Sequence, residues 1–198
     1  SDDYIVYDQS ADARLGVYYY ESGAYPRKST VIYDRARSSM CTLSIDELPG
    51  DIYEKTKVFH ISSITLAIDK NLRETALEMI KRFHNAGALI SFDVNYRSAL
   101  WSEEEAREVI QSVLKYVDFL FVSEETSRRM LQREGTLEEI MQGYVKDYGC
   151  KLVATTRREV ISPMRHNFNS KIFFDGKFYE EKPYNNIEVI DRIGSGDA

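Results

Sequence analysis

Two glycines and a carboxylate stand together near the end of the sequence, in the order Gly194-Ser195-Gly196-Asp197. Glycine allows backbone conformations with positive φ and a close approach by a ligand. Successive amides in such a run can point at one anion, particularly where a helix begins. Asp197 beside a phosphate makes sense as a base that takes the proton of an alcohol attacking the phosphoryl group. The alternative is a glycine turn followed by an N-cap aspartate.

A second polar group follows an apolar run of residues. Asp93, Asn95 and Arg97 occupy alternate positions beyond that run. Three polar groups on one side of an extended loop can grip a polyol or a phosphate, and Arg97 can pair in bidentate fashion with a carboxylate or phosphate. The alternative is a solvated loop between a strand and a helix, closed by an Asx turn.

A third group lies on two short extended segments, residues 13–21 and 28–35. Tyr18, Tyr33 and Arg35 combine flat aromatic rings with a guanidinium, which suits an anionic or hydroxylated substrate. The chain has 14 tyrosines, and most of them are expected to be half-buried sheet residues. A purely structural role for Tyr18 and Tyr33 therefore stays open.

Alternating strands and helices must position these residues. Four short apolar runs are separated by stretches with helical spacing, and Ser102 with Glu105, and Thr136 with Glu139, predict capping boxes. This alternation predicts an α/β fold with a mostly parallel sheet covered on both faces. A hairpin turn is predicted at Asp175-Gly176. The strands are predicted at residues 57–62, 88–95, 118–123 and 150–156.

The carboxyl ends of parallel strands are where such sheets bind ligands. These ends carry Ser62, Asp93, Ser123 and Thr156. Glu124, next to Ser123, can help to hold Mg²⁺ through water, or it can serve the start of a helix. The three histidines show no spacing typical of metal ligands, and His60, inside an apolar strand, is predicted to be a core residue.

Composition excludes several classes of protein. A net charge of −6 argues against nucleic acid as the main partner, and 43% hydrophobic residues exclude wholesale disorder. No apolar run approaches the roughly 20 residues that span a bilayer. Two cysteines are too few for a disulfide framework and are expected to be buried and reduced. We therefore expect a soluble protein of a reducing compartment, the cytoplasm, with no membrane or nucleic-acid partner.

Together these segments resemble one family. The run DRIGSGDA resembles the Gly-Ala-Gly-Asp signature of the PfkB/ribokinase family of carbohydrate kinases. FDVNYRSALW resembles the Asp-x-Asn-x-Arg segment of the same family, in the form found in 2-keto-3-deoxygluconate kinases. HISSITLAI, DFLFVSEET and the pair GVYYYE and VIYDR are similar to further segments. The resemblance runs from about residue 13 to the end of the chain.

The resemblance implies a ribokinase-like three-layer sandwich. Its parts are a leading segment over 1–12, part of a small β lid over 13–36, and an α/β kinase core over 37–198. The chain is expected to be the middle of a larger kinase, truncated at both ends. Lid strands of this family often form dimer surfaces, so the resemblance also implies a possible homo-oligomer through the lid.

The resemblance also implies a role for each predicted site residue. Asp197 would be the catalytic base, and residues 194–196 would form the anion hole for the transferring phosphoryl group. The lid cluster would contact the sugar acid, and the polar residues at 93, 95 and 97 would line the cleft. Two motifs depart from the family: residues 123–126 replace Asn-x-x-Glu, and residues 155–160 contain no glycine. Near ATP and Mg²⁺ we expect Ser123, Glu124, Thr156 and Arg157.

The expected reaction is ATP-dependent phosphorylation of a primary hydroxyl of a sugar acid. We expect 2-keto-3-deoxygluconate as the substrate, because the carboxylate of a keto acid needs a cationic partner such as Arg35. The alternatives are a fructokinase or another PfkB sugar kinase, and a non-catalytic sensor of sugar acids or nucleotides. The 198-residue segment alone is expected to be inactive.

Overall fold

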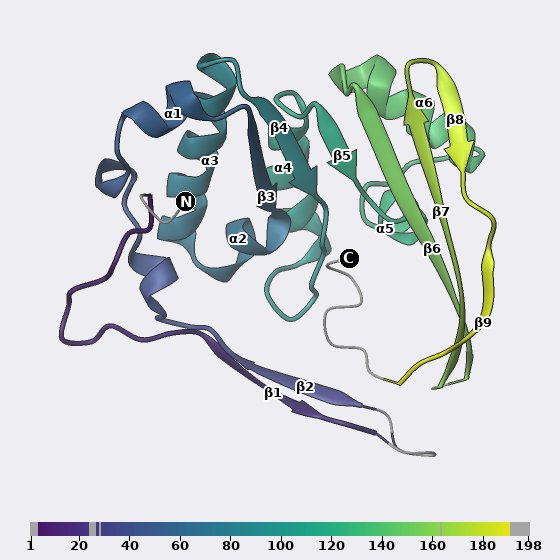
Figure 1. Cartoon of the computed structure of the whole chain (residues 1–198), viewed down its shortest axis with the longest axis horizontal. Helices are drawn as coiled ribbons and strands as arrows, with labels where there is room; N and C mark the ends of the chain where they lie inside the picture. Colours follow the sequence, from purple (N-terminus) through teal and green to yellow (C-terminus); the bar gives the residue numbers. More distant parts are fainter. Residues whose placement is uncertain (1–3, 24–26, 28, 163, 191–198) are drawn as a thin grey trace.

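The structure is a computed structural model that describes residues 4–23, 27, 29–162 and 164–190. Figure 1 shows its two sheets. Strands β1 (Val17–Glu21) and β2 (Thr30–Asp34) form a separate antiparallel pair within the segment 13–36, which is called the lid below after the sequence-based expectation. The larger sheet has seven strands within the described residues. They are β3 (Val58–Ser62), β4 (Leu89–Asp93), β5 (Phe119–Phe121), β6 (Leu152–Ser162), β7 (Arg165–Phe174), β8 (Lys177–Glu180) and β9 (Tyr184–Glu188).

Strands β3, β4, β5 and β6 lie side by side in parallel, as the sequence predicts. Strands β7, β8 and β9 continue the sheet in antiparallel fashion, with β8 and β9 both pairing with β7. The connections hold two short 3-10 turns, η1 (Ser39–Thr42) and η2 (Ile45–Glu47). The helices are α1 (Asp51–Lys55), α2 (Ser63–Ile68), α3 (Lys70–Asn85), α4 (Glu103–Leu114), α5 (Glu124–Arg129) and α6 (Leu137–Tyr148).

Side chains that cap the helices explain where they begin. The Asp69 carboxylate accepts hydrogen bonds from two amides of the first turn of α3. Thr136 and Glu139 form the complete capping box predicted at α6, and Gly149 ends that helix at φ +78°. At α4 only half of the predicted box forms. Ser102 Oγ accepts from the Glu105 amide, while the Glu105 carboxylate pairs with Arg73 instead.

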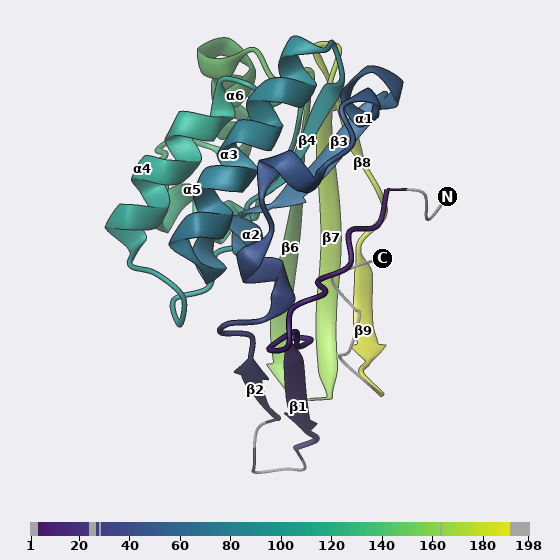
Figure 2. The ribbon, with the colours of Figure 1, turned by 90° about the vertical axis from the view of Figure 1, so that its left-hand side faces the viewer.

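The core lies between the larger sheet and a layer of helices that includes α3, α4 and α6 (Figure 2). Alternate strand residues point into it, and Ile80, Ile90, Phe92 and Leu120 are completely buried. The opposite face of the sheet stays exposed within the described residues, so these residues supply one of the two predicted helical layers. Exposed apolar residues on that face are Val58, Phe121, Ile172, Phe174 and Tyr179.

Two predictions about the sheet were wrong. The fourth strand, predicted to end at residue 156, continues to Ser162, because β7 supplies an antiparallel partner along its whole length. His60 is exposed rather than buried, since it points to the uncovered face, where its Nδ1 lies 2.8 Å from Ser91 Oγ. The hairpin at Asp175-Gly176 is confirmed, with both residues at positive φ.

The two cysteines are both free and buried, as the sequence predicts. Burial raises the pKa of the Cys150 thiol to about 12. In the part of the chain that the structure describes, no helix is both long and apolar enough to cross a bilayer.

Candidate active site

The register of the parallel strands aligns the carboxyl ends of the sheet. Ser62 pairs with Asp93, Asp93 with Phe121, and Phe121 with Ala154. Asn95, Ser123 and Thr156 each follow one of these aligned residues by two positions. Most of the residues that the sequence singles out in the core therefore come to one edge of the sheet, although they come from separate strands.

The loop after β4 carries Asn95 and Arg97 and is closed by its own contacts. The Tyr96 hydroxyl donates to the carbonyl of Trp101 at 3.3 Å, and the Leu100 amide donates to the carbonyl of Arg97 at 3.0 Å. Asn95 is half-buried, whereas Arg97 is exposed and makes no ion pair within the described residues. The loop thus presents a free guanidinium and an amide at the edge.

The lid brings its three predicted residues together. Tyr18 pairs directly with Tyr33 across the strands, and their ring centroids are 6.1 Å apart. The Arg35 guanidinium carbon lies 3.8 Å from the centroid of the Tyr33 ring, a cation–π contact. No carboxylate within the described residues pairs with Arg35. Figures 1 and 2 both place the lid beyond the end of the sheet where β3 and β4 terminate.

Arg14 anchors the base of the lid, a role that the sequence pattern did not indicate. Its guanidinium forms a 2.7 Å ion pair with Asp34 and donates to the carbonyl of Ala36 at 2.8 Å. Ser39 Oγ, just beyond the lid, accepts from the Arg14 amide. These contacts fix the two ends of the lid to each other. An isolated arginine before a strand carries no sequence signal for such a role.

Glu124 begins helix α5, which is the structural alternative given for it above, and Ser123 is the N-cap of that helix. Ser123 Oγ accepts from the Thr126 amide as an N-cap. Glu124 Oε1 accepts from Arg128 at 2.9 Å. Both contacts with Arg128 use Oε1, and Oε2 has no partner among the described residues. No group of three or more His, Cys, Asp or Glu residues within the described ranges is arranged to hold a metal.

The sequence predicts Thr156 as the last residue of a strand and Arg157 beyond it, whereas both lie inside the longer strand β6. They pair with Ser170 and Asn169 in the β6–β7 ladder, and both side chains are exposed. Their backbone is thereby fixed, and the Arg157 side chain extends from a rigid strand. The predicted catalytic residues Gly194, Ser195, Gly196 and Asp197 lie outside the described residues.

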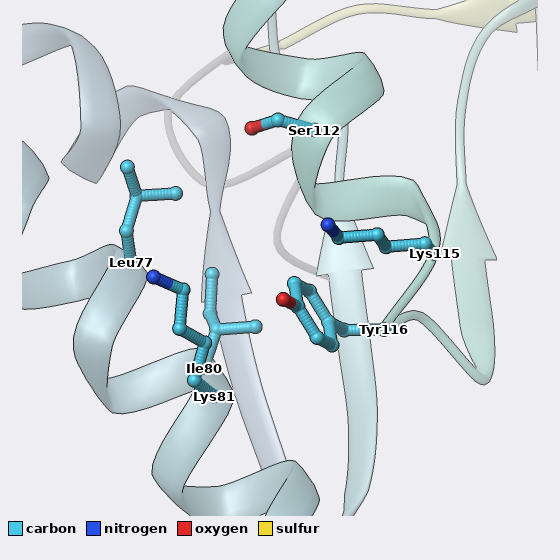
Figure 3. A pocket seen from close by; sticks show the side chains of 6 residues that line it. All are labelled: Leu77, Ile80, Lys81, Ser112, Lys115 and Tyr116. Atoms are coloured by element: carbon cyan, nitrogen blue, oxygen red, sulfur yellow. The ribbon is translucent and has the colours of Figure 1, made fainter.

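The surface also carries grooves away from this edge. Figure 3 shows one of about 180 Å³ between α3 and α4. A second, wider one of about 500 Å³ lies over β7 and β8. Neither contains a predicted site residue, and the first lies where α4 ends, before β5 begins. The first is lined by Leu77, Ile80, Lys81, Ser112, Lys115 and Tyr116.

Comparison with known proteins gives consistent matches. The family model described as pfkB family carbohydrate kinase matches residues 3–198. A 2-dehydro-3-deoxygalactonokinase from Haloferax volcanii is 38% identical over 187 residues, which cover 94% of this chain and 56% of that protein. A 5-dehydro-2-deoxygluconokinase from Clostridium perfringens is 27% identical, over 87% of this chain and 49% of that protein. The chain spans about half the length of these curated relatives.

Solved structures match in the same way. The 2-dehydro-3-deoxygluconokinase of Thermotoga maritima superposes with a TM-score of 0.86 at 33% identity, over 94% of this chain and 58% of that one. A fructokinase from Xylella fastidiosa with bound ATP gives a TM-score of 0.73 at 18% identity, over 95% of this chain and 55% of that one, and shows the shared fold alone. The predicted ribokinase-like α/β fold is thereby confirmed.

Proposed function

The chain belongs to the pfkB family of carbohydrate kinases, and from this premise we propose that the protein phosphorylates a primary hydroxyl of 2-keto-3-deoxygluconate with ATP. The observation that carries the proposal is the lid cluster of Tyr18, Tyr33 and Arg35, which stands at the end of the molecule where the polar strand ends gather. The names of the relatives from Haloferax volcanii and Thermotoga maritima support the class of substrate.

Arg35 is the residue that selects an acid over a neutral sugar. Its guanidinium stacks on Tyr33, and the edge with the N–H donors stays free for a carboxylate, since no described carboxylate occupies it. A guanidinium fork binds a carboxylate through two parallel hydrogen bonds. Fructose and ribose have no carboxylate and gain nothing from this contact.

The strand ends supply the remaining contacts of the proposal. Asp93 and Asn95 offer acceptors and an amide for sugar hydroxyls, and Arg97 offers a free cation for a phosphate or for the sugar acid. Ser123, Thr156 and Arg157 occupy the neighbouring part of the same edge, where we place the ATP phosphates. Asp197 takes the proton from the attacking hydroxyl, and the amides of residues 194–196 stabilise the developing charge.

At this edge Glu124 is the carboxylate that would hold magnesium. Glu124 Oε2 is free for a water-mediated contact, while Arg128 holds Oε1 in place. Mg²⁺ commonly keeps several waters and is bound by one or two carboxylates together with substrate phosphates. When bound, it supplies positive charge that offsets the charge on the ATP phosphates.

An ATP-consumption assay on the full-length protein tests the proposal. A panel of 2-keto-3-deoxygluconate, its C4 epimer, fructose and ribose should give the highest kcat/KM for a 2-keto-3-deoxy sugar acid. Fructose or ribose as the best substrate would overturn the sugar-acid assignment, and no turnover of any sugar would overturn the kinase itself. In the same protein, Asp197→Asn should abolish turnover and leave sugar binding nearly intact. A kcat equal to that of the wild type would exclude Asp197 as the catalytic base.

Arg35→Ala tests the carboxylate contact. The KM for the sugar acid should rise at least about tenfold, because a charge-assisted bidentate pair is lost, while the KM for ATP stays the same. Arg27→Ala is the matched control, because Arg27 is an exposed lid arginine paired with Glu21. An equal loss of affinity for both ligands would argue against the contact.

The lid also supports an assembly of two copies of this chain. Val17, Tyr19 and Ile32 are apolar or aromatic and exposed on a two-stranded sheet, and apolar surface of this kind is stabilised by burial. Ile32→Glu should shift the full-length protein toward the monomer in analytical ultracentrifugation. An unchanged sedimentation coefficient would place the interface elsewhere.

The free, buried thiols support a reducing compartment, the cytoplasm, as the protein's location.

A further inference from the structure

Arg73, in helix α3, contacts helix α2, helix α4 and the loop that precedes α4. Its Nε donates to the carbonyl of Leu66 in α2 at 2.7 Å, and its Nη1 pairs with Glu105 Oε1 at the start of α4 at 2.8 Å. Its guanidinium carbon lies 5.3 Å from the centroid of the Trp101 ring. The side chain is only 17% exposed. One planar group thus contacts an orphan carbonyl of a helix end, a carboxylate and an aromatic ring.

The position of Arg73 is unfavourable for its own helix. It lies in the first turns of α3, where the helix dipole disfavours a cation. The Glu105 carboxylate, which the sequence assigns to a capping box, is drawn away to Arg73. Two local preferences are therefore given up for this one contact, which indicates that the contact has a role between elements.

What Arg73 holds is the loop of residues 94–101. Trp101 ends this loop and is 5% exposed, yet its Nε1 has no hydrogen-bond acceptor within the described residues. Packing and the cation above its ring therefore fix it. The Trp101 carbonyl in turn accepts from Tyr96, the residue between Asn95 and Arg97. A chain of contacts therefore runs from Arg73 through Trp101 to Tyr96, whose neighbours in the sequence are Asn95 and Arg97.

We propose that Arg73 is a positioning residue that holds the 94–101 loop and thereby sets the affinity for the phosphoryl acceptor. The inference rests on the proposed function, in that the acceptor is a sugar bound at this loop. Lysine cannot replace the arginine fully, because a single ammonium cannot reach a carbonyl, a carboxylate and a ring face in one plane.

Steady-state kinetics of the full-length kinase test the role. Arg73→Gln should raise the KM for the acceptor about tenfold and leave the KM for ATP within about twofold, because a small displacement of a binding loop is costly. Arg73→Lys should recover part of this loss. Arg82→Gln is the matched control, since Arg82 lies on the same helix but, among the described residues, pairs with Glu78 and with the Tyr53 ring and not with the 94–101 loop. The acceptor is whichever sugar the wild-type enzyme phosphorylates.

Hydrogen exchange gives a readout that does not depend on turnover. In Arg73→Gln, amides of the 94–101 loop should exchange faster than in the wild type, while amides of α6 should not change. Unchanged exchange in the loop would overturn the proposal that Arg73 holds it. Faster exchange with an unchanged KM for the acceptor, or a parallel rise of both KM values, would overturn the positioning role. A wild-type enzyme that phosphorylates no sugar refutes the proposed function before any variant is compared.

Discussion

The helical core and the lid belong to one chain but are stabilised in different ways. In the core, Ile80, Ile90 and Phe92 are completely buried between the sheet and the helices. In the lid, Tyr19 and Ile32 are each 64% exposed. A two-stranded hairpin on its own is marginally stable in water. The core therefore fixes the strand ends whether or not a ligand is present, whereas the lid depends on few anchors and on what binds to it.

The core and the lid therefore have different tasks in the proposed function. Under the proposed function, the core holds Asp93, Asn95 and Arg97 at the strand ends, and the lid would bring Tyr33 and Arg35 to the substrate. The lid is fixed at its base by Arg14, through Asp34 and Ser39. Substrate that contacts both regions would add to the stability of the lid more than to that of the core. The five predictions that follow probe the core and the lid.

Phe92→Ala should have the largest effect on global stability. Removing a large aromatic side chain from a fully buried site costs about 3–5 kcal/mol of the free energy of unfolding. Ile32→Ala, in the lid, should cost less than about 0.5 kcal/mol, because its side chain is already exposed. Urea unfolding followed by circular dichroism measures both values. Similar losses for the two variants would contradict the contrast.

The rates at which Cys41 and Cys150 are chemically modified should report opening of the lid and of the core separately. Burial raises the pKa of Cys150 from 9.0 to about 12, so its thiolate fraction at pH 8 should fall about a thousandfold. Cys41 follows the lid, where its thiol donates to the Arg35 carbonyl. Opening of the lid base should therefore expose Cys41 first. A thiol reagent followed by peptide mass spectrometry should modify Cys41 first, and earlier modification of Cys150 would contradict this.

The same raised pKa has a consequence for stability. Because the folded state holds the proton of Cys150 more tightly than the unfolded state, the stability from this group is complete below pH 9 and is lost as the pH rises toward 12. Tyr144, whose pKa burial also raises to about 12, contributes with the same sign above pH 10. The free energy of unfolding should fall over this range, and less steeply in Cys150→Ala.

Thr136→Ala should have an intermediate effect. Loss of the capping box at α6 should cost about 1 kcal/mol, since both bonds of the box are made here. Ser102→Ala should cost less, because its box is only half formed. Thermal unfolding of the two variants gives the comparison, and a larger loss for Ser102→Ala would contradict it.

Arg14→Gln should have the smallest effect on global stability and a clear local one. The free energy of unfolding should change by less than about 0.5 kcal/mol, because Arg14 is partly exposed and paired at the surface. Cleavage of the lid by chymotrypsin should nevertheless become several-fold faster than in the wild type, because the backbone beside its exposed tyrosines leaves the β1–β2 pairing when the lid opens. Arg128→Gln, at the surface of α5, is the control. Equal cleavage in all three proteins would show that Arg14 does not hold the lid.

Much of the fold could be read from the sequence because it depends on local patterns. Apolar runs predicted β3, β4 and β5 to within a few residues, and Thr136 with Glu139 predicted the start of α6. The turn at residues 175–176 followed from its residue types. Hydrogen bonds within one helix or turn involve near neighbours, so neighbouring residues are sufficient to determine them.

For the candidate site, only the residue types could be predicted from the sequence, and not their contacts. The sequence by itself determined the residue types at the strand ends and in the lid, and the order in which the elements follow. The tertiary structure alone decided that Tyr18 lies against Tyr33, that β6 continues to residue 162, and that Glu105 pairs with Arg73 rather than with its own helix end. Arg73 and Glu105 lie 32 residues apart along the chain, so only the packing of their helices brings them together. The two strand pairings join nearer residues, but their length and register depend on cross-strand contacts that no local pattern specifies.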